Sequence, residues 1–193
     1  ENAFRLTPEE LQAAITPRTK ALILPYPCNP TGAIMEKADL EAIAAVLREK
    51  NILVISDEIY AELTYGRKHY SIAQIEGMKE RTVYVSGFSK AFAMTGWRLG
   101  YACGPKEIIE QMVKIHQFAI MCAPTTSQYA AIEALRSCDE EVAAMVEEYD
   151  TRIKLTIKAD IPMMFRMMFE KKLQQGLDQA VDMLCQVPYN NWL

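Results

Sequence analysis

Three short apolar runs, each ending at a proline or a polar residue, constrain the fold most. They are KALILP at residues 20–25, NILVIS at residues 51–56 and TVYV at residues 82–85. Continuous apolar runs of this length are typical of strands buried on both faces, as in a parallel sheet. The segment 36–50 carries apolar residues at helical spacing, namely Leu40, Ile43, Ala44 and Leu47. Strands that alternate with amphipathic helices predict an α/β fold with a mostly parallel sheet.

The other segments are expected to be mostly helical. Thr7-Pro8-Glu9-Glu10 is typical of a helix start, with Thr7 as N-cap and Glu10 completing a capping box. Residues 98–103 are a candidate fourth strand. Further helices are predicted over residues 105–116 and 124–136, in a long segment that Ser137-x-x-Glu140 opens as a capping box, and over the methionine-rich residues 165–184 after the break at Pro162. We expect one domain over residues 1–150 and a helical extension over residues 151–193.

Charge and hydropathy indicate which partners to expect. The formal net charge is -4 and the basic residues are scattered, so the chain lacks the basic patch that nucleic acid or an anionic membrane surface would require. No apolar run approaches the roughly 20 residues that span a bilayer, and no signal peptide opens the sequence. We therefore expect small-molecule partners.

The cysteines and histidines do not suggest a metal site or a disulfide framework. The five cysteines form no C-x-x-C pair, and their number is odd. The two histidines, His69 and His116, are far apart and have no cysteine cluster near them, so they are expected to be surface or packing residues. The sequence predicts reduced thiols, a cytoplasmic protein and no metal.

Polar residues that could bind a ligand or take part in a reaction follow the predicted strands. Asn29 comes shortly after the first run, Asp57 directly after the second, and Ser86 to Lys90 after the third. Ligands of open α/β sheets bind outside the carboxyl ends of the strands, so these are candidate site residues. Each also has a plainer interpretation. Asn29-Pro30-Thr31-Gly32 is equally typical of a turn, Asp57 of a helix N-cap, and Lys90 or Arg98 of a solvated surface cation.

Three motifs stand in a fixed order along the chain. Asn29-Pro30-Thr31-Gly32 comes first, Asp57-Glu58-Ile59-Tyr60 second, and the segment SGFSKAFAMTGWRLG at residues 86–100 third. In order and spacing they resemble the class I/II aminotransferases of fold type I, over about residues 2–149. The resemblance implies the large domain of a pyridoxal-5'-phosphate-dependent transferase, a three-layer α/β sandwich. It also implies a homodimer that acts on an amino acid and a 2-oxo acid.

The resemblance assigns catalytic roles to Lys90, Asp57 and Tyr60. Lys90 would carry the cofactor as a Schiff base and then move the proton at the substrate's α-carbon. Asp57 would face the pyridine nitrogen and keep it protonated, so that the ring accepts the electron pair of the carbanion. The Tyr60 hydroxyl and the Asn29 amide would both bind the cofactor's phenolic oxygen.

The resemblance also implies residues for the cofactor's phosphate. Arg98 would pair with it through a bidentate guanidinium fork, and the Ser89 hydroxyl would supply a further donor. Ser86 is a weaker candidate. Gly87 departs from the pattern because some family members have another serine there.

Several parts of a full-length family member have no counterpart in this sequence. They are the glycine-containing loop that cradles the phosphate, the aromatic residue that stacks on the ring, and the late arginine that grips the substrate's α-carboxylate. Arg166, the one arginine after Arg152, lies in a different context. The chain also begins without methionine. We therefore expect a truncated aminotransferase, with two alternatives: a catalytically silent fragment that keeps the fold, or a carbon–sulfur β-lyase.

Overall fold

The computed structural model describes residues 2–158 of the 193-residue chain. The chain divides into two units, residues 1–147 and 148–193. The candidate site lies entirely in the first unit. The predicted helix over residues 165–184 and the break at Pro162 lie outside the described residues, and the domain boundary near residue 150 stays a prediction.

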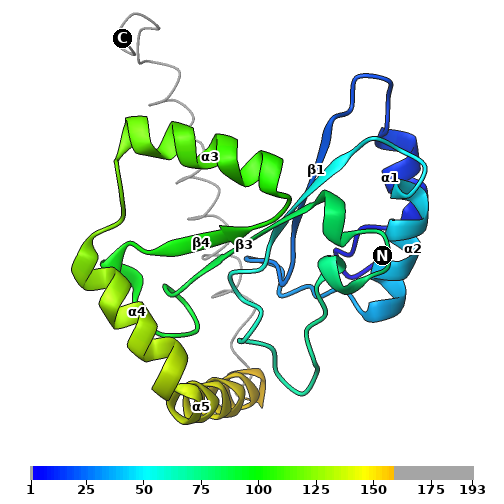
Figure 1. Ribbon diagram of the computed structural model, residues 1–193. Helices are drawn as coiled ribbons and strands as arrows, with labels where there is room; N and C mark the ends of the chain where they lie inside the picture. Colours follow the sequence, from blue (N-terminus) through cyan, green and yellow to red (C-terminus); the bar gives the residue numbers. More distant parts are fainter. Residues whose placement is uncertain (1, 159–193) are drawn as a thin grey trace, which may run out of the picture. The chain divides into compact units, whose positions relative to one another are not determined.

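A four-stranded sheet forms the centre of the first unit (Figure 1). Its strands are β1 (Ala21–Pro25), β2 (Leu53–Asp57), β3 (Thr82–Gly87) and β4 (Gly100–Cys103), in the order β1-β2-β3-β4. The first three run parallel, and β4 is antiparallel to β3. This arrangement confirms the predicted α/β fold with a mostly parallel sheet.

The main apolar core lies against the sheet on the side of two helices, α1 (Pro8–Ala14) and α2 (Lys37–Leu47). The α2 residues predicted from helical spacing, Leu40, Ile43, Ala44 and Leu47, are all buried. They pack with Leu24 of β1 and Val54 of β2. Burying each large aliphatic side chain contributes roughly 2 kcal/mol, so this contact holds α2 on the sheet.

The start of α1 follows from its sequence. The Thr7 side chain accepts a hydrogen bond from the Glu10 N–H, and the Glu10 side chain accepts one from the Thr7 N–H, with Pro8 in the first turn. This reciprocal pair confirms the predicted capping box.

The side chains of β2 alternate between the two faces of the sheet. Val54 and Ser56 are buried on the side of α2, while Ile55 and Asp57 are half-buried. Successive side chains of a strand point to opposite faces. Asp57 is therefore directed away from the main core.

Three longer helices follow β4 in the chain: α3 (Lys106–Ala119), α4 (Thr125–Ser137) and α5 (Asp139–Lys158). The α4 residues Ala131 and Ala134 pack against Phe88 and Met94 in a second apolar cluster. Helix α4 thus supports the loop that follows β3. Three short 3-10 helices complete the described elements: η1 (Ile72–Gln74), η2 (Lys79–Arg81) and η3 (Thr95–Trp97).

The observed bounds differ from the predicted ones at several places; for example, the fourth strand begins at Gly100 and not at residue 98, and α3 continues to Ala119. Strand β2 includes Asp57, and β3 continues to Gly87 because it pairs with β4, where Gly87 lies opposite Gly100. The predicted N-cap Ser137 is wrong, since Ser137 is the last residue of α4 and α5 begins at Asp139. None of the helices within residues 2–158 combines the length and apolar character needed to cross a membrane.

Candidate active site

The carboxyl ends of the three parallel strands meet at one edge of the sheet. Pro25 of β1 lies beside Asp57 of β2, and Asp57 lies beside Val85 of β3. The loops that leave this edge carry Asn29, Tyr60 and Lys90. The fold therefore brings sequence-distant candidate residues to one place, as expected for an open α/β sheet.

Side-chain contacts join the loops after β1, β2 and β3. The Asn29 amide nitrogen Nδ2 donates a hydrogen bond to the Tyr60 hydroxyl over 3.2 Å. The Lys90 amine Nζ lies 5.4 Å from the centroid of the Tyr60 ring, within the range of a cation–π interaction. An amide, a phenol and a primary amine, each from a different loop, thus form a single cluster.

The Asn29 loop is also a tight turn. The Gly32 N–H bonds the Cys28 carbonyl over 2.8 Å, and the Cys28 N–H bonds the Ala33 carbonyl over 2.9 Å. Gly32 has a φ of 70°, which glycine adopts without the steric cost that a side chain brings. The chain does turn at this motif, with the closing bond between Cys28 and Gly32, and the turn presents Asn29 to Tyr60.

Asp57 ends β2 and caps a turn. Its Oδ1 accepts a hydrogen bond from the Ile59 N–H over 3.2 Å. The residues that follow form a turn and not a helix, so the helix N-cap alternative for Asp57 is wrong in its detail. One oxygen has this backbone partner, and the side chain lies on the sheet face away from the main core.

The loop after Lys90 holds the two predicted phosphate ligands, Ser89 and Arg98, through Thr95. The Thr95 hydroxyl donates to the Ser89 carbonyl over 2.8 Å, and Arg98 Nη1 donates to the Thr95 carbonyl over 2.9 Å. Arg98 has left-handed backbone angles, φ 53° and ψ 47°. A non-glycine residue in this region costs about 1–3 kcal/mol and persists only where surrounding contacts impose it.

A buried serine of α4 supplies one of those contacts. Ser127 is 4% exposed and donates a hydrogen bond to the Trp97 carbonyl over 2.8 Å. That carbonyl belongs to the peptide group leading into Arg98. Sequence reasoning missed Thr95 and Ser127 because a serine or threonine gives no local signal of a distant backbone partner.

Ser86, the weaker phosphate candidate, is engaged elsewhere. Its hydroxyl donates to the Glu58 carbonyl over 3.4 Å. This contact joins the end of β3 to the residue after Asp57. The Ser86 hydroxyl therefore helps to hold the ends of β2 and β3 together.

Sequence reasoning also missed Glu58. This residue is 1% exposed, and its carboxylate accepts hydrogen bonds from Ser56, Ser71 and His69. His69, expected to be a surface or packing histidine, is the last of these partners, with 15% of its side chain exposed. The available signal was strand alternation, which places Glu58 on the same side as the buried Val54 and Ser56.

Tyr84 of β3 lies in a half-buried aromatic cluster near this edge. Its ring stacks on Tyr101 of β4, with centroids 6.1 Å apart. Burial raises the pKa of Tyr84 to about 12, and the charges of Tyr101 and Glu58 act in the same direction. Tyr84 is therefore protonated at neutral pH and is not a base.

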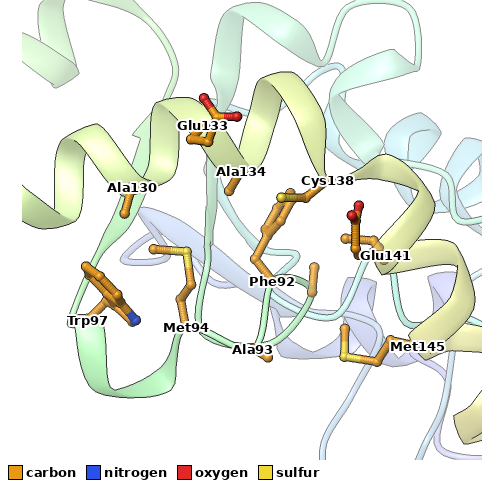
Figure 2. Close-up of a pocket in the computed structure, with 12 residues that line it drawn as sticks. Phe92, Ala93, Met94, Trp97, Ala130, Glu133, Ala134, Cys138, Glu141 and Met145 are labelled. Carbon is orange, nitrogen blue, oxygen red and sulfur yellow. The ribbon is translucent and has the colours of Figure 1, made fainter.

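An apolar cavity of about 380 Å³ is lined in part by the loop that follows Lys90. Figure 2 shows its lining, which comes from the loop after Lys90, from α4 and from the start of α5 and includes Phe92, Met94 and Met145. Among the described residues, those lining the cavity include none of the predicted site residues. The cavity is separate from the Asn29–Tyr60–Lys90 cluster.

Within the described residues, no group of three or more histidine, cysteine or acidic side chains is placed to hold a metal ion. The four cysteines in this part of the chain, Cys28, Cys103, Cys122 and Cys138, are free thiols. The contacts bring together a lysine amine, a phenol and an amide. The Asp57 carboxylate and the Arg98 guanidinium bond residues of their own loops, Ile59 and Thr95.

Comparisons with known proteins agree with these motifs. The model of the family "Aminotransferase class I and II" matches residues 1–159. The putative aminotransferase YugH of Bacillus subtilis is 47% identical over 82% of this chain and 41% of its own length. The aspartate aminotransferase of Pyrococcus abyssi is 52% identical, again over 82% of this chain and 41% of its own length.

Solved structures give the same result. The aromatic aminotransferase of Pyrococcus horikoshii superposes with a TM-score of 0.78 at 50% identity, covering 81% of this chain and 43% of that one. The aspartate aminotransferase of Rhizobium meliloti gives a TM-score of 0.79 at 39% identity. The chain thus spans about 41% of the length of the curated relatives. On the family match and these identities, the chain belongs to the class I and II aminotransferases.

Proposed function

We propose that this chain is the cofactor-binding part of a pyridoxal-5'-phosphate-dependent aminotransferase, which moves an amino group between an amino acid and a 2-oxo acid. The observation that carries the proposal is the contact of Asn29, Tyr60 and Lys90 at the carboxyl edge of a parallel sheet. The relatives are named for aspartate, aromatic and diaminopimelate substrates, so the proposal concerns the reaction class.

The chemistry of this donor set fits pyridoxal phosphate. When bound, the cofactor supplies an aldehyde that reacts with a primary amine and a pyridine ring that accepts an electron pair. Lys90 offers that amine beside a phenol. Its freed amine would move the proton at the substrate's α-carbon. Tyr60 and Asn29 share a hydrogen bond, and both would contact the cofactor's phenolic oxygen.

Asp57 would hold a proton at the pyridine nitrogen. A carboxylate stabilises a cationic partner at hydrogen-bond distance and so favours its protonated form. One Asp57 oxygen already bonds the Ile59 N–H, which fixes the carboxylate. The rest of the carboxylate's hydrogen-bonding capacity would be used to accept a hydrogen bond from the protonated ring nitrogen.

Arg98 and Ser89 would bind the cofactor's phosphate. The guanidinium fork matches two phosphate oxygens, and the Ser89 hydroxyl adds a third donor. Thr95 is hydrogen-bonded to both residues: its hydroxyl donates to the Ser89 carbonyl, and its carbonyl accepts from Arg98 Nη1. Ser89 and Arg98 are therefore held in one loop. The partner of the chain would be a second copy, forming a homodimer.

A second candidate is a catalytically silent fragment that keeps the fold and some cofactor affinity. This candidate concerns the 193-residue chain by itself, which spans about 41% of the relatives' length. The residues named above would bind and orient the cofactor, and none of them would hold the substrate's carboxylate. Missing one preorganised charged contact commonly lowers the rate by about two to three orders of magnitude.

Titrating the 193-residue chain with pyridoxal phosphate would test the proposal. Binding to a lysine should produce a visible absorbance band, and Lys90→Arg should abolish it because arginine keeps the charge and cannot form the covalent bond. Adding an amino acid then separates the two candidates. Bleaching of the band at enzymatic rates indicates an aminotransferase, whereas a persistent band indicates the silent fragment. An unchanged band in Lys90→Arg contradicts both.

A further inference from the structure

Glu58 is a buried carboxylate to which the proposed function gives no role. It is 1% exposed, and both of its oxygens accept hydrogen bonds. Oε1 accepts from the hydroxyls of Ser56 and Ser71 over 2.8 Å and 2.6 Å, and Oε2 accepts from His69 Nε2 over 2.5 Å. Burying a carboxylate costs free energy unless hydrogen-bond donors satisfy it, so the three converging donors offset the cost of burying Glu58.

The Glu58 contacts join three separate segments. Ser56 lies in β2, whereas His69 and Ser71 lie in the segment before η1. Ser71 is in turn the N-cap of η1, where its hydroxyl accepts from the Ala73 N–H over 3.2 Å. The main chain of Glu58 reaches the third segment, since its N–H bonds the Val85 carbonyl of β3 over 2.8 Å.

The carbonyl of Glu58 holds the turn that carries Tyr60. It accepts a hydrogen bond from the Ala61 N–H over 2.9 Å and a longer one from the Ser86 hydroxyl over 3.4 Å. Glu58 is therefore fixed through its side chain, its N–H and its carbonyl. The turn between Glu58 and Ala61 contains Tyr60, the residue that contacts Asn29 and Lys90.

Asp57 and Glu58 point to opposite faces of the same strand end. Strand alternation places the Glu58 carboxylate with the buried Ser56 and directs the half-buried Asp57 to the other face. A shift of Glu58 would therefore move Asp57 and Tyr60 together. A group that must meet a ligand within about 0.5 Å depends on this kind of support.

We propose that Glu58, paired with His69, is a positioning residue that sets the direction in which Asp57 and Tyr60 face the cofactor. This inference rests on the proposed function, because it takes Asp57 and Tyr60 as the groups that bind the cofactor. The plainer role for Glu58 is to anchor the segment before η1 to the sheet, with no effect on Tyr60. The two roles differ in what a substitution changes.

Glu58→Gln is the main variant for this test. Glutamine keeps the volume but replaces one acceptor oxygen by an NH₂ group, which can no longer accept from its former donor. His69→Gln removes the imidazole from the other side of the same contact. Thr82→Val is the matched control. Thr82 is 2% exposed and donates to the Met78 carbonyl over 2.7 Å, so valine also deletes a buried hydrogen bond, at the opposite end of β3.

Two readouts are needed, one without and one with cofactor. In the cofactor-free chain, His69→Gln should shift the NMR amide resonance of Tyr60, because His69 is distant from Tyr60 in sequence and contacts the Glu58 carboxylate. With pyridoxal phosphate, Glu58→Gln and His69→Gln should both raise the dissociation constant about tenfold or more, the size of effect seen when groups that orient metal ligands are removed. Thr82→Val should lower the melting temperature without either change.

The proposal is overturned if Glu58→Gln and His69→Gln lower the melting temperature but leave the dissociation constant within twofold of the original chain, with the Tyr60 resonance of His69→Gln in place. Failure of the proposed function looks different, because the unsubstituted chain itself would then bind no cofactor. In that case the cofactor-free spectra still decide about Glu58. Shifted Tyr60 resonances in His69→Gln would support the positioning role of Glu58, and unshifted ones would overturn it.

Discussion

The amine of Lys90 lies 5.4 Å from the centre of the Tyr60 ring, although the two residues leave the sheet from different strands. The Tyr60 hydroxyl also accepts a hydrogen bond from Asn29, in the loop after a third strand. Tyr60 is therefore the residue that connects the first two motifs to the lysine. Its ring and its hydroxyl make different contacts and can be tested separately.

Tyr60→Phe should weaken cofactor binding while leaving the fold intact. The variant keeps the ring beside Lys90 but removes the hydroxyl, and one hydrogen bond contributes about 1 kcal/mol, which corresponds to roughly a fivefold change in affinity. Tyr129→Phe is the matched control because Tyr129 is 71% exposed on α4. Titration followed by visible absorbance measures both. Equal affinities for the two variants would contradict the role given to the Tyr60 hydroxyl.

Arg98→Lys should weaken the binding of pyridoxal phosphate about tenfold but change the binding of pyridoxal little. Lysine keeps the positive charge and loses the bidentate fork, so the loss should depend on the phosphate group. Comparing the dissociation constants of the two compounds measures this dependence. A similar loss for both compounds would place Arg98 away from the phosphate.

Ser127→Ala should lower the free energy of unfolding by about 0.5–1.5 kcal/mol, because it deletes the hydrogen bond that the buried Ser127 side chain donates to the Trp97 carbonyl. Ser137→Ala, at an exposed position of the same helix, should change it by less than about 0.5 kcal/mol. Chemical denaturation measures both values. If the two substitutions have the same effect, α4 does not hold the Trp97–Arg98 turn.

The stability of the chain should fall as the pH rises above about 10, with Tyr84 contributing to the fall. Burial raises the pKa of Tyr84 from 10.0 to about 12 in the folded state. Between these values the unfolded chain loses the proton and the folded chain keeps it, so rising pH favours unfolding. Tyr84→Phe removes this contribution, and denaturation at several alkaline pH values should show a shallower decline. An unchanged slope would contradict the raised pKa.

Some site residues could be predicted because a general rule for parallel sheets gives their place in the fold. Asn29, Asp57 and Lys90 each follow an apolar run, and parallel strands bring their carboxyl ends to one edge. The capping box at Thr7 was predictable because both of its hydrogen bonds are local in sequence. These predictions needed no knowledge of distant contacts.

Other features depend on long-range contacts and escaped prediction. Glu58 is a charged residue that is buried because donors from beyond β2, His69 and Ser71, reach it. The left-handed turn at Arg98 is set by contacts that include Ser127, which lies in another helix. The cap predicted at Ser137 was wrong because α4 continues through that residue. The local sequence does not reveal where one helix ends and the next begins.

The central claim is that Lys90 carries the cofactor, and reduction of the loaded chain with borohydride followed by peptide mapping tests it most directly. Reduction fixes the bond between the lysine and the cofactor aldehyde, so the modified peptide identifies the lysine. We predict the label on the peptide that contains Lys90, and its loss in Lys90→Arg. A label on Lys106 or Lys114 of α3, with Lys90 unmodified, would contradict the account.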